Sequence, residues 1–151
     1  MALKSIEKTW AFPNDRYYDR NTHMWAKRDG DSGDVICGVD VLLLESLGEL
    51  VYVSLQAAGV PARQGEPVGM MEAAKMTGDV AAPVSGVLTA RNEAVMRNPS
   101  LINDDPYGAG WLVKIKPSDW EAEAAELVGP EELAGWSAAE IERYRREGWL
   151  D

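Results

Sequence analysis

The segment from Pro67 to Gly86 constrains the fold more than any other part of the chain. Apolar residues run from Pro67 to Met71, a single lysine (Lys75) follows among small residues, and a second extended stretch ends at Pro83. Apolar runs that are bounded by proline and glycine are typical of strands joined by a turn. The segment therefore predicts a β-hairpin that presents Lys75 near its tip.

A lysine at the tip of a hairpin has two interpretations. Most exposed lysines in turns are simply solvated charges. The alternative is covalent attachment of a long prosthetic group, because an amine on a protruding turn is accessible to a modifying enzyme while the flanking strands hold it in place. Glu72 lies three residues before Lys75 and Asp79 four residues after it. Gly78 is expected to allow a turn with positive φ, which is a structural role.

The residues around Lys75 resemble the modified-lysine hairpin of the biotinyl and lipoyl carrier families. Both families hold their cofactor as an amide on such a lysine and pass groups between enzymes. The string Glu72–Met76 is more similar to biotinyl hairpins, although Ala74 stands where that family has methionine. The hairpin alone therefore leaves a biotinyl carrier open.

The rest of the chain resembles the glycine-cleavage H proteins, which are the lipoyl carriers of that system. The segments that match this family in order and spacing are His23–Trp25, Gly38–Asp40, Leu47–Val53, Asn103–Ile115 and Lys116–Asp119. The resemblance implies lipoate that is bound covalently to Lys75 as a swinging arm. It also implies that Glu72 and Asp79 help a lipoate ligase or lipoyl transferase to recognise the hairpin, with solvation of the turn as the alternative for both acids. His23 is implied to line the groove where the loaded arm rests, with a packed structural side chain as the alternative.

The hairpin departs from ordinary H proteins at Ala73, Ala74, Met76 and Ala81. A divergent branch of H-like lipoate-binding proteins serves bacterial sulfur oxidation together with a heterodisulfide-reductase-like complex. The departures favour that branch, so the predicted cargo is a sulfur-containing intermediate. A glycine cleavage H protein that carries the aminomethyl group in glycine decarboxylation is the alternative, with glycine cleavage enzymes as its partners. A biotinyl carrier is the third alternative, and an unmodified structural or adaptor module is the fourth.

Composition excludes several other classes of function. The formal net charge is −10, with 25 acidic and 15 basic residues, which disfavours binding to nucleic acid. Cys37 is the only cysteine and His23 the only histidine, so neither an internal disulfide nor a Cys/His zinc site can form. Cys37 is expected to be a small buried apolar residue. No nucleophile–histidine constellation or phosphate-binding loop is present, so we expect a carrier and not an enzyme.

The cellular location and the oligomeric state of the protein are inferred from the lack of contrary signals in the sequence. No run of about 18 apolar residues is present, so neither a membrane span nor a membrane partner is expected. Residues 1–8 lack the apolar core of a signal peptide, which favours the cytoplasm. We expect a monomer.

Short runs of strand-forming residues between glycines and prolines predict a mainly β fold. The resemblance implies a flattened β-sandwich, the barrel-sandwich hybrid or hammerhead of lipoyl domains, with short flanking helices. We expect a flexible N-terminus at residues 1–9, the carrier domain at 10–117 and a C-terminal helical extension at 118–151 that packs on it. Trp10–Pro13 is predicted as a short strand, and Ser137–Glu140 is predicted to open a separate last helix as a capping box.

Overall fold

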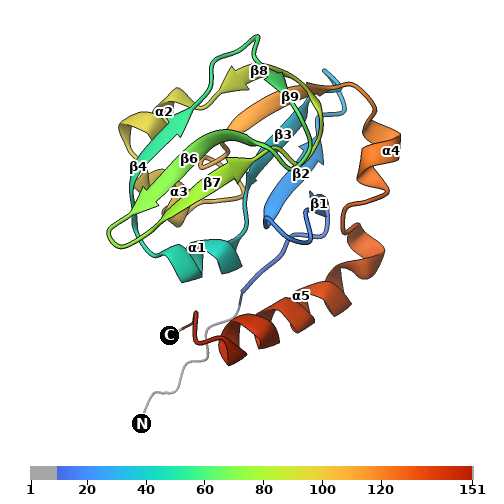
Figure 1. Ribbon diagram of the computed structural model, residues 1–151. Helices are drawn as coiled ribbons and strands as arrows, with labels where there is room; N and C mark the ends of the chain where they lie inside the picture. Colours follow the sequence, from blue (N-terminus) through green and yellow to red (C-terminus); the bar gives the residue numbers. More distant parts are fainter. Residues whose placement is uncertain (1–9, 151) are drawn as a thin grey trace.

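The computed structural model describes residues 10–150, and in this range nine strands form two antiparallel sheets (Figure 1). The strands are β1 (Tyr17–Tyr18), β2 (Met24–Arg28), β3 (Val35–Val39), β4 (Leu50–Leu55), β5 (Pro61–Ala62), β6 (Pro67–Ala73), β7 (Thr77–Ala81), β8 (Gly86–Arg91) and β9 (Val113–Pro117). The helices are α1 (Val41–Leu47), α2 (Glu93–Arg97), α3 (Ser100–Asp104), α4 (Trp120–Ala124) and α5 (Pro130–Arg146).

The two sheets enclose a common apolar core. One sheet has the strand order β1-β2-β3-β9-β8-β5 and the other has the order β4-β6-β7. Val53 and Met71 from the smaller sheet pack with Cys37, Leu88 and Ile115 from the larger one, and all five are buried. The predicted mainly β sandwich is confirmed, and removal of these side chains from water is its main stabilising contribution.

Helix α1 begins and ends where local sequence signals place its ends. The side chain of Asp40 caps the helix by accepting hydrogen bonds from the backbone N–H groups of Leu42 and Leu43, both at 3.0 Å. Gly48 follows the last helical residue with φ at 88°, a left-handed value that glycine adopts without strain. The helix therefore connects the larger sheet to the smaller one at a fixed position.

The larger sheet contains one contact that only a glycine permits. Trp25 of β2 faces Gly38 of β3 as its Cα partner, and the indole packs directly against the glycine. A Cβ atom at position 38 would lie 2.4 Å from the Trp25 ring. Trp25 also donates from Nε1 to the carbonyl oxygen of Pro106 at 3.2 Å. The indole is thus held in one orientation on the sheet.

The C-terminal part is helical, and α5 lies below the two sheets in Figure 1. Leu133 of α5 is buried in a second apolar cluster with Tyr18 and Trp25, and Trp136 packs against that cluster. The prediction that Ser137 opens a separate helix is wrong. Ser137 lies inside one continuous helix, where its hydroxyl donates to the carbonyl oxygen of Ala134.

Two further predictions about the N-terminal part have different outcomes. The predicted strand at Trp10–Pro13 is wrong, because the first strand is β1, which pairs with Trp25 and Ala26 of β2. The predicted N-terminal segment 1–9 lies outside the described residues. Among residues 10–150, no helix is both long enough and apolar enough to cross a bilayer.

Candidate functional site

Lys75 lies at the exposed tip of the hairpin formed by β6 and β7. Ala74, Lys75 and Met76 connect the two strands, and the backbone N–H of Ala73 donates to the carbonyl oxygen of Met76 at 2.9 Å to close the turn. Met71 of β6 pairs with Gly78 of β7 and is fully buried in the core. The buried part of the hairpin therefore fixes the direction in which its tip protrudes.

Glu72 and Asp79 lie on the outward face of the same hairpin. Asp79 is the Cα partner of Met70, two residues before Glu72, so the two carboxylates share one face of the small sheet. Both side chains are exposed, and among residues 10–150 neither makes an ion pair. The two acids therefore flank Lys75 as free carboxylates.

The prediction that Gly78 adopts positive φ in the turn is wrong. Gly78 is a regular residue of β7, and it is absent from the glycines with positive φ, which are Gly33, Gly48, Gly59, Gly65, Gly86 and Gly148. A Cβ atom at position 78 would meet only the Leu47 side chain, at an ordinary distance of 3.7 Å. The turn takes its shape from the residues of the tip, so Gly78 needs neither conformational freedom nor extra space.

We expect Gly78→Ala to change the free energy of unfolding by less than about 0.5 kcal/mol, because the new methyl group meets no close contact. Gly69→Ala, in the neighbouring strand β6, is the matched control. Its Cβ atom would lie 2.3 Å from the carbonyl oxygen of Ser54, so a loss of about 1–3 kcal/mol is expected. Urea denaturation of both variants measures the difference, and equal losses would contradict the extended conformation of Gly78.

A groove with a volume of about 860 Å³ lies beside Lys75. Four segments form its walls: Asn21 in the loop before β2, the hairpin tip, the end of α1, and the end of α5 with the residues that follow it. The lining residues are Asn21, Leu43, Glu45, Ser46, Leu47, Gly48, Lys75, Met76, Thr77, Gly78, Arg143, Tyr144, Gly148 and Trp149. Met76 and Trp149 are 48% and 46% exposed, so apolar surface is available near the lysine.

His23 does not line this groove, because its side chain is only 1% exposed. Its Nδ1 atom lies 2.6 Å from Oδ2 of Asp40, and its Nε2 atom lies 2.7 Å from Oε1 of Glu140. Glu140 belongs to α5, which also carries Arg143 and Tyr144 of the groove wall. His23 therefore joins α5 to the N-terminal end of α1, and it acts on the groove through the positions of these two helices.

The electrostatics of this bridge favour a charged imidazole. Burial lowers the pKa of His23, but the hydrogen bonds and charges of Asp40 and Glu140 outweigh burial and raise it above the ordinary value. Burial also opposes ionisation of Asp40 by raising its pKa. We assign the ionised pair, because both His23 nitrogens face carboxylate oxygens and only the imidazolium donates from both. Arg143 contributes by donating to Glu140 and lowering the pKa of that carboxyl.

The raised pKa of His23 makes stability depend on pH. The stabilising contribution is fully present below the unfolded value of about 6.5 and is lost as pH rises through the folded value. We expect the free energy of unfolding to fall as the pH rises from about 6.5 into the mildly alkaline range. Burial raises the pKa of Tyr144 to about 12, so this neighbour does not titrate in that window.

His23→Asn is the control for this pH dependence. Asparagine tolerates positive φ better than most residues, and His23 has φ at 64°. The variant should be less stable overall and should show a flatter pH profile in the same window. Urea denaturation at several pH values measures both profiles, and a parallel decline in the two proteins would assign the effect to other groups.

Cys37 lies in the core and not at the groove. Its side chain is fully buried, and burial raises the pKa of the thiol. The prediction of a small buried apolar residue is confirmed, and a thiolate at neutral pH is disfavoured at this position.

Comparisons with known proteins agree over most of the chain. The family model for the glycine cleavage H-protein matches residues 16–139. The glycine cleavage system H protein of Carboxydothermus hydrogenoformans is 41% identical over 120 residues, which cover 80% of this chain and 89% of that protein. The glycine cleavage system H protein of Thermus thermophilus is 40% identical over 107 residues, which cover 71% of this chain and 81% of that protein.

A solved structure of an H protein is also similar to this chain over most of its length. The crystal structure of a glycine cleavage system H protein from Mycobacterium marinum superimposes with a TM-score of 0.73 at 34% sequence identity. The superposition covers 84% of this chain and 99% of that one. The chain therefore belongs to the glycine cleavage H-protein family, a family of non-catalytic lipoyl carriers.

Proposed function

We propose that this chain carries the aminomethyl group in glycine decarboxylation on a lipoyl group that is amide-linked to Nζ of Lys75. The observation that carries the proposal is the position of Lys75, at an exposed hairpin tip beside a groove, in a chain that is similar to H proteins over most of its length. When bound, the lipoyl group supplies a dithiolane at the end of a long flexible arm.

The residues around Lys75 fit such a group. Formation of the amide removes the charge of Lys75, so the linked chain can lie against apolar surface without burying an ammonium group. Leu47, Met76 and Trp149 provide such surface in the groove. A covalent arm also keeps its cargo at a high effective concentration near each partner enzyme. The groove therefore has the lining and the position to receive a mainly aliphatic arm from Lys75.

The partners follow from the same proposal. Attachment requires a lipoate ligase or a lipoyl transferase, and the exposed Glu72 and Asp79 would contact it on either side of Lys75. The enzymes of glycine cleavage would then dock around the hairpin tip, in the cytoplasm. We propose that residues 10–117 form the carrier domain and that 118–151 form its helical extension, although the family match continues beyond 117 to residue 139.

Transport of a sulfur-containing intermediate, with a heterodisulfide-reductase-like complex as partner, is the second candidate. Four departures from ordinary H proteins favour it, provided that they lie on a docking surface. Ala73 and Ala81 are each only 5% exposed, so they cannot contact a partner. Ala74 and Met76 remain exposed at the tip. The candidate therefore rests on two surface residues, whereas glycine cleavage is supported by similarity along the chain.

A reconstituted glycine cleavage assay tests the choice between the two candidates. We expect the lipoylated protein to support glycine decarboxylation at a rate similar to that of an ordinary H protein, and the unloaded protein to support none. The assay measures exchange of labelled bicarbonate with glycine carboxyl carbon. Full lipoylation and a native fold without exchange would contradict glycine cleavage and leave sulfur transport as the better candidate.

A further inference from the structure

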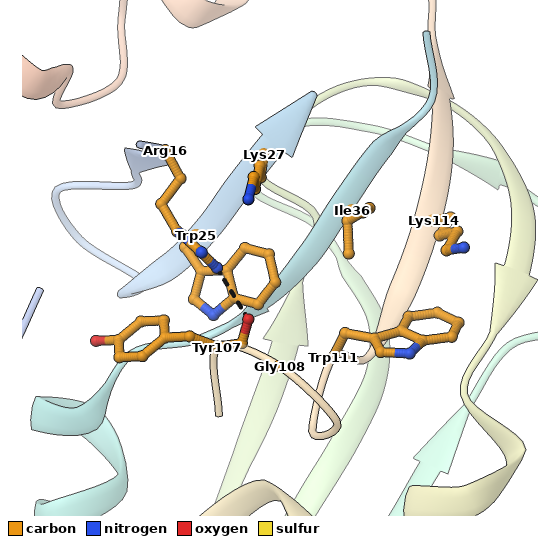
Figure 2. A pocket seen from close by; sticks show the side chains of 8 residues that line it. All are labelled: Arg16, Trp25, Lys27, Ile36, Tyr107, Gly108, Trp111 and Lys114. Carbon is orange, nitrogen blue, oxygen red and sulfur yellow. Dashed lines mark hydrogen bonds between the residues drawn. The ribbon is translucent and has the colours of Figure 1, made fainter. Parts of the chain in front are cut away.

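A second pocket, with a volume of about 240 Å³, lies on the outer face of the larger sheet and shares no lining residue with the groove beside Lys75 (Figure 2). Its lining combines cationic side chains with aromatic rings and contains no acidic residue. The lining residues are Arg16, Trp25, Lys27, Ile36, Tyr107, Gly108, Trp111 and Lys114. The function proposed above does not use any of them.

Two lysines stand on either side of an isoleucine along one edge of this pocket. Lys27 of β2 is the Cα partner of Ile36 of β3, and Ile36 is in turn the partner of Lys114 of β9. Residues paired in this way point to the same face of the sheet. Neighbouring strands are about 4.8 Å apart, so the two lysine Cα atoms are separated by about 10 Å. This spacing leaves room for a small group above Ile36, between the two ammonium ions.

Aromatic residues form the opposite side of the pocket. The indole of Trp25 packs directly against Gly38, and Figure 2 shows Trp111 to the right of Trp25, below Ile36 and Lys114. The Arg16 guanidinium lies 4.6 Å from the centroid of the Trp25 ring, and its Nη1 atom donates to the carbonyl oxygen of Tyr107 at 3.1 Å. These contacts hold Trp25 and Tyr107 in place before any ligand arrives, so little ordering of these two residues is required on binding.

The charges in the pocket are not balanced. Asp15, outside the lining, pairs with Arg16 at 2.9 Å and with Lys27 at 3.0 Å. Among residues 10–150, Lys114 forms no ion pair and lies 5.0 Å from the centroid of the Trp111 ring. Three cations thus face one directly paired carboxylate, while Asp29 acts on Lys114 only through its charge at longer range, in a chain whose formal net charge is −10. Positive charge concentrated in one place on an acidic protein favours an anion there.

We propose that this pocket binds a small organic acid with one carboxylate and a flat apolar body. The carboxylate would accept hydrogen bonds from Lys114 and Lys27, and the apolar body would lie over Ile36 and against Trp111. The volume corresponds to about eight water molecules, which suits a small acid and is below the range of larger ligands. The apolar walls disfavour inorganic phosphate, which needs hydrogen-bond donors on all sides.

Nuclear magnetic resonance titration of the full chain with 3-phenylpropionate tests the proposal. We expect saturable shifts of the indole N–H signals of Trp111 and Trp25. The neutral amide of the same compound should bind much more weakly, because it lacks the charge. Inorganic phosphate should also bind weakly, because it lacks the apolar body. Absence of saturable shifts with 3-phenylpropionate, or equal binding of either control compound, would overturn the proposal.

A pair of lysine variants on one strand locates the site. Lys114→Ala should weaken binding about tenfold, because it removes a charge-assisted hydrogen bond. Lys116→Ala is the matched control, since Lys116 lies on the same face of β9 but outside the pocket, and it should bind like the wild type. Neither side chain is in the core, so both variants should fold. Equal affinity in the two variants would place any binding elsewhere and overturn the proposal.

Discussion

Lys75→Arg is expected to abolish attachment of lipoate while leaving the fold unchanged. The guanidinium group remains protonated at all accessible pH values and provides no amine nucleophile for acylation. The position is an exposed hairpin tip, where a substitution alters stability by no more than about 0.5 kcal/mol. Incubation with lipoate, ATP and a lipoate ligase, followed by mass spectrometry, measures loading, and circular dichroism measures the fold.

Lys116→Arg is the matched control, because it makes the same chemical change at an exposed lysine away from the hairpin tip. It should load to the wild-type extent. Peptide mapping of the loaded wild type should place the added mass on Lys75. A lipoyl mass on another lysine, with Lys75 unmodified, would refute the proposed site and leave the family membership untouched.

Asp40→Ala is expected to produce the largest loss of stability, about 3–5 kcal/mol, because it breaks a buried ion pair from one side. The Asp40 carboxylate is fully buried, and it accepts from His23 at 2.6 Å and from the backbone N–H groups of Leu42 and Leu43. Its removal leaves the imidazolium of His23 without one partner and leaves the first turn of α1 without its cap. Urea denaturation measures the free energy of unfolding.

Asp119→Ala separates the two contributions. Asp119 caps α4 by accepting from the backbone N–H of Ala122 at 3.3 Å, but it is exposed and has no buried partner. Loss of a helix cap alone costs about 1 kcal/mol. If Asp40→Ala lowers the free energy of unfolding by no more than Asp119→Ala does, the contact between Asp40 and His23 contributes little to stability.

The sequence predicted those structural features that are decided by residues close together in the chain. The hairpin around Lys75 follows from the proline and glycine residues that bound its strands. The buried position of Cys37 follows from its apolar strand. In each of these, the residues that decide the conformation lie within a few positions of one another.

Local sequence signals do not predict contacts between segments that are far apart in the chain. His23 and Glu140 are 117 positions apart, so their hydrogen bond has no local pattern, and the groove wall formed by Tyr144 and Trp149 was missed for the same reason. The aromatic residues near the C-terminus were a signal that a surface there is buried or functional, but they could not identify the facing segment. Ser137 shows the opposite error, because its capping pattern was overridden by a helix that had already begun at Pro130.

The packing of Trp25 on Gly38 has a consequence for how this sequence can vary. No side chain at position 38 can coexist with an indole at position 25, since even a methyl group would overlap the ring. The two positions should therefore change together: among natural variants that keep the same strand pairing, a residue larger than glycine at 38 should occur only where 25 holds a small side chain. An alignment of relatives that is scored for this pair alone would reveal such mutual exclusion, and random mutagenesis should recover changes at position 38 only as double substitutions.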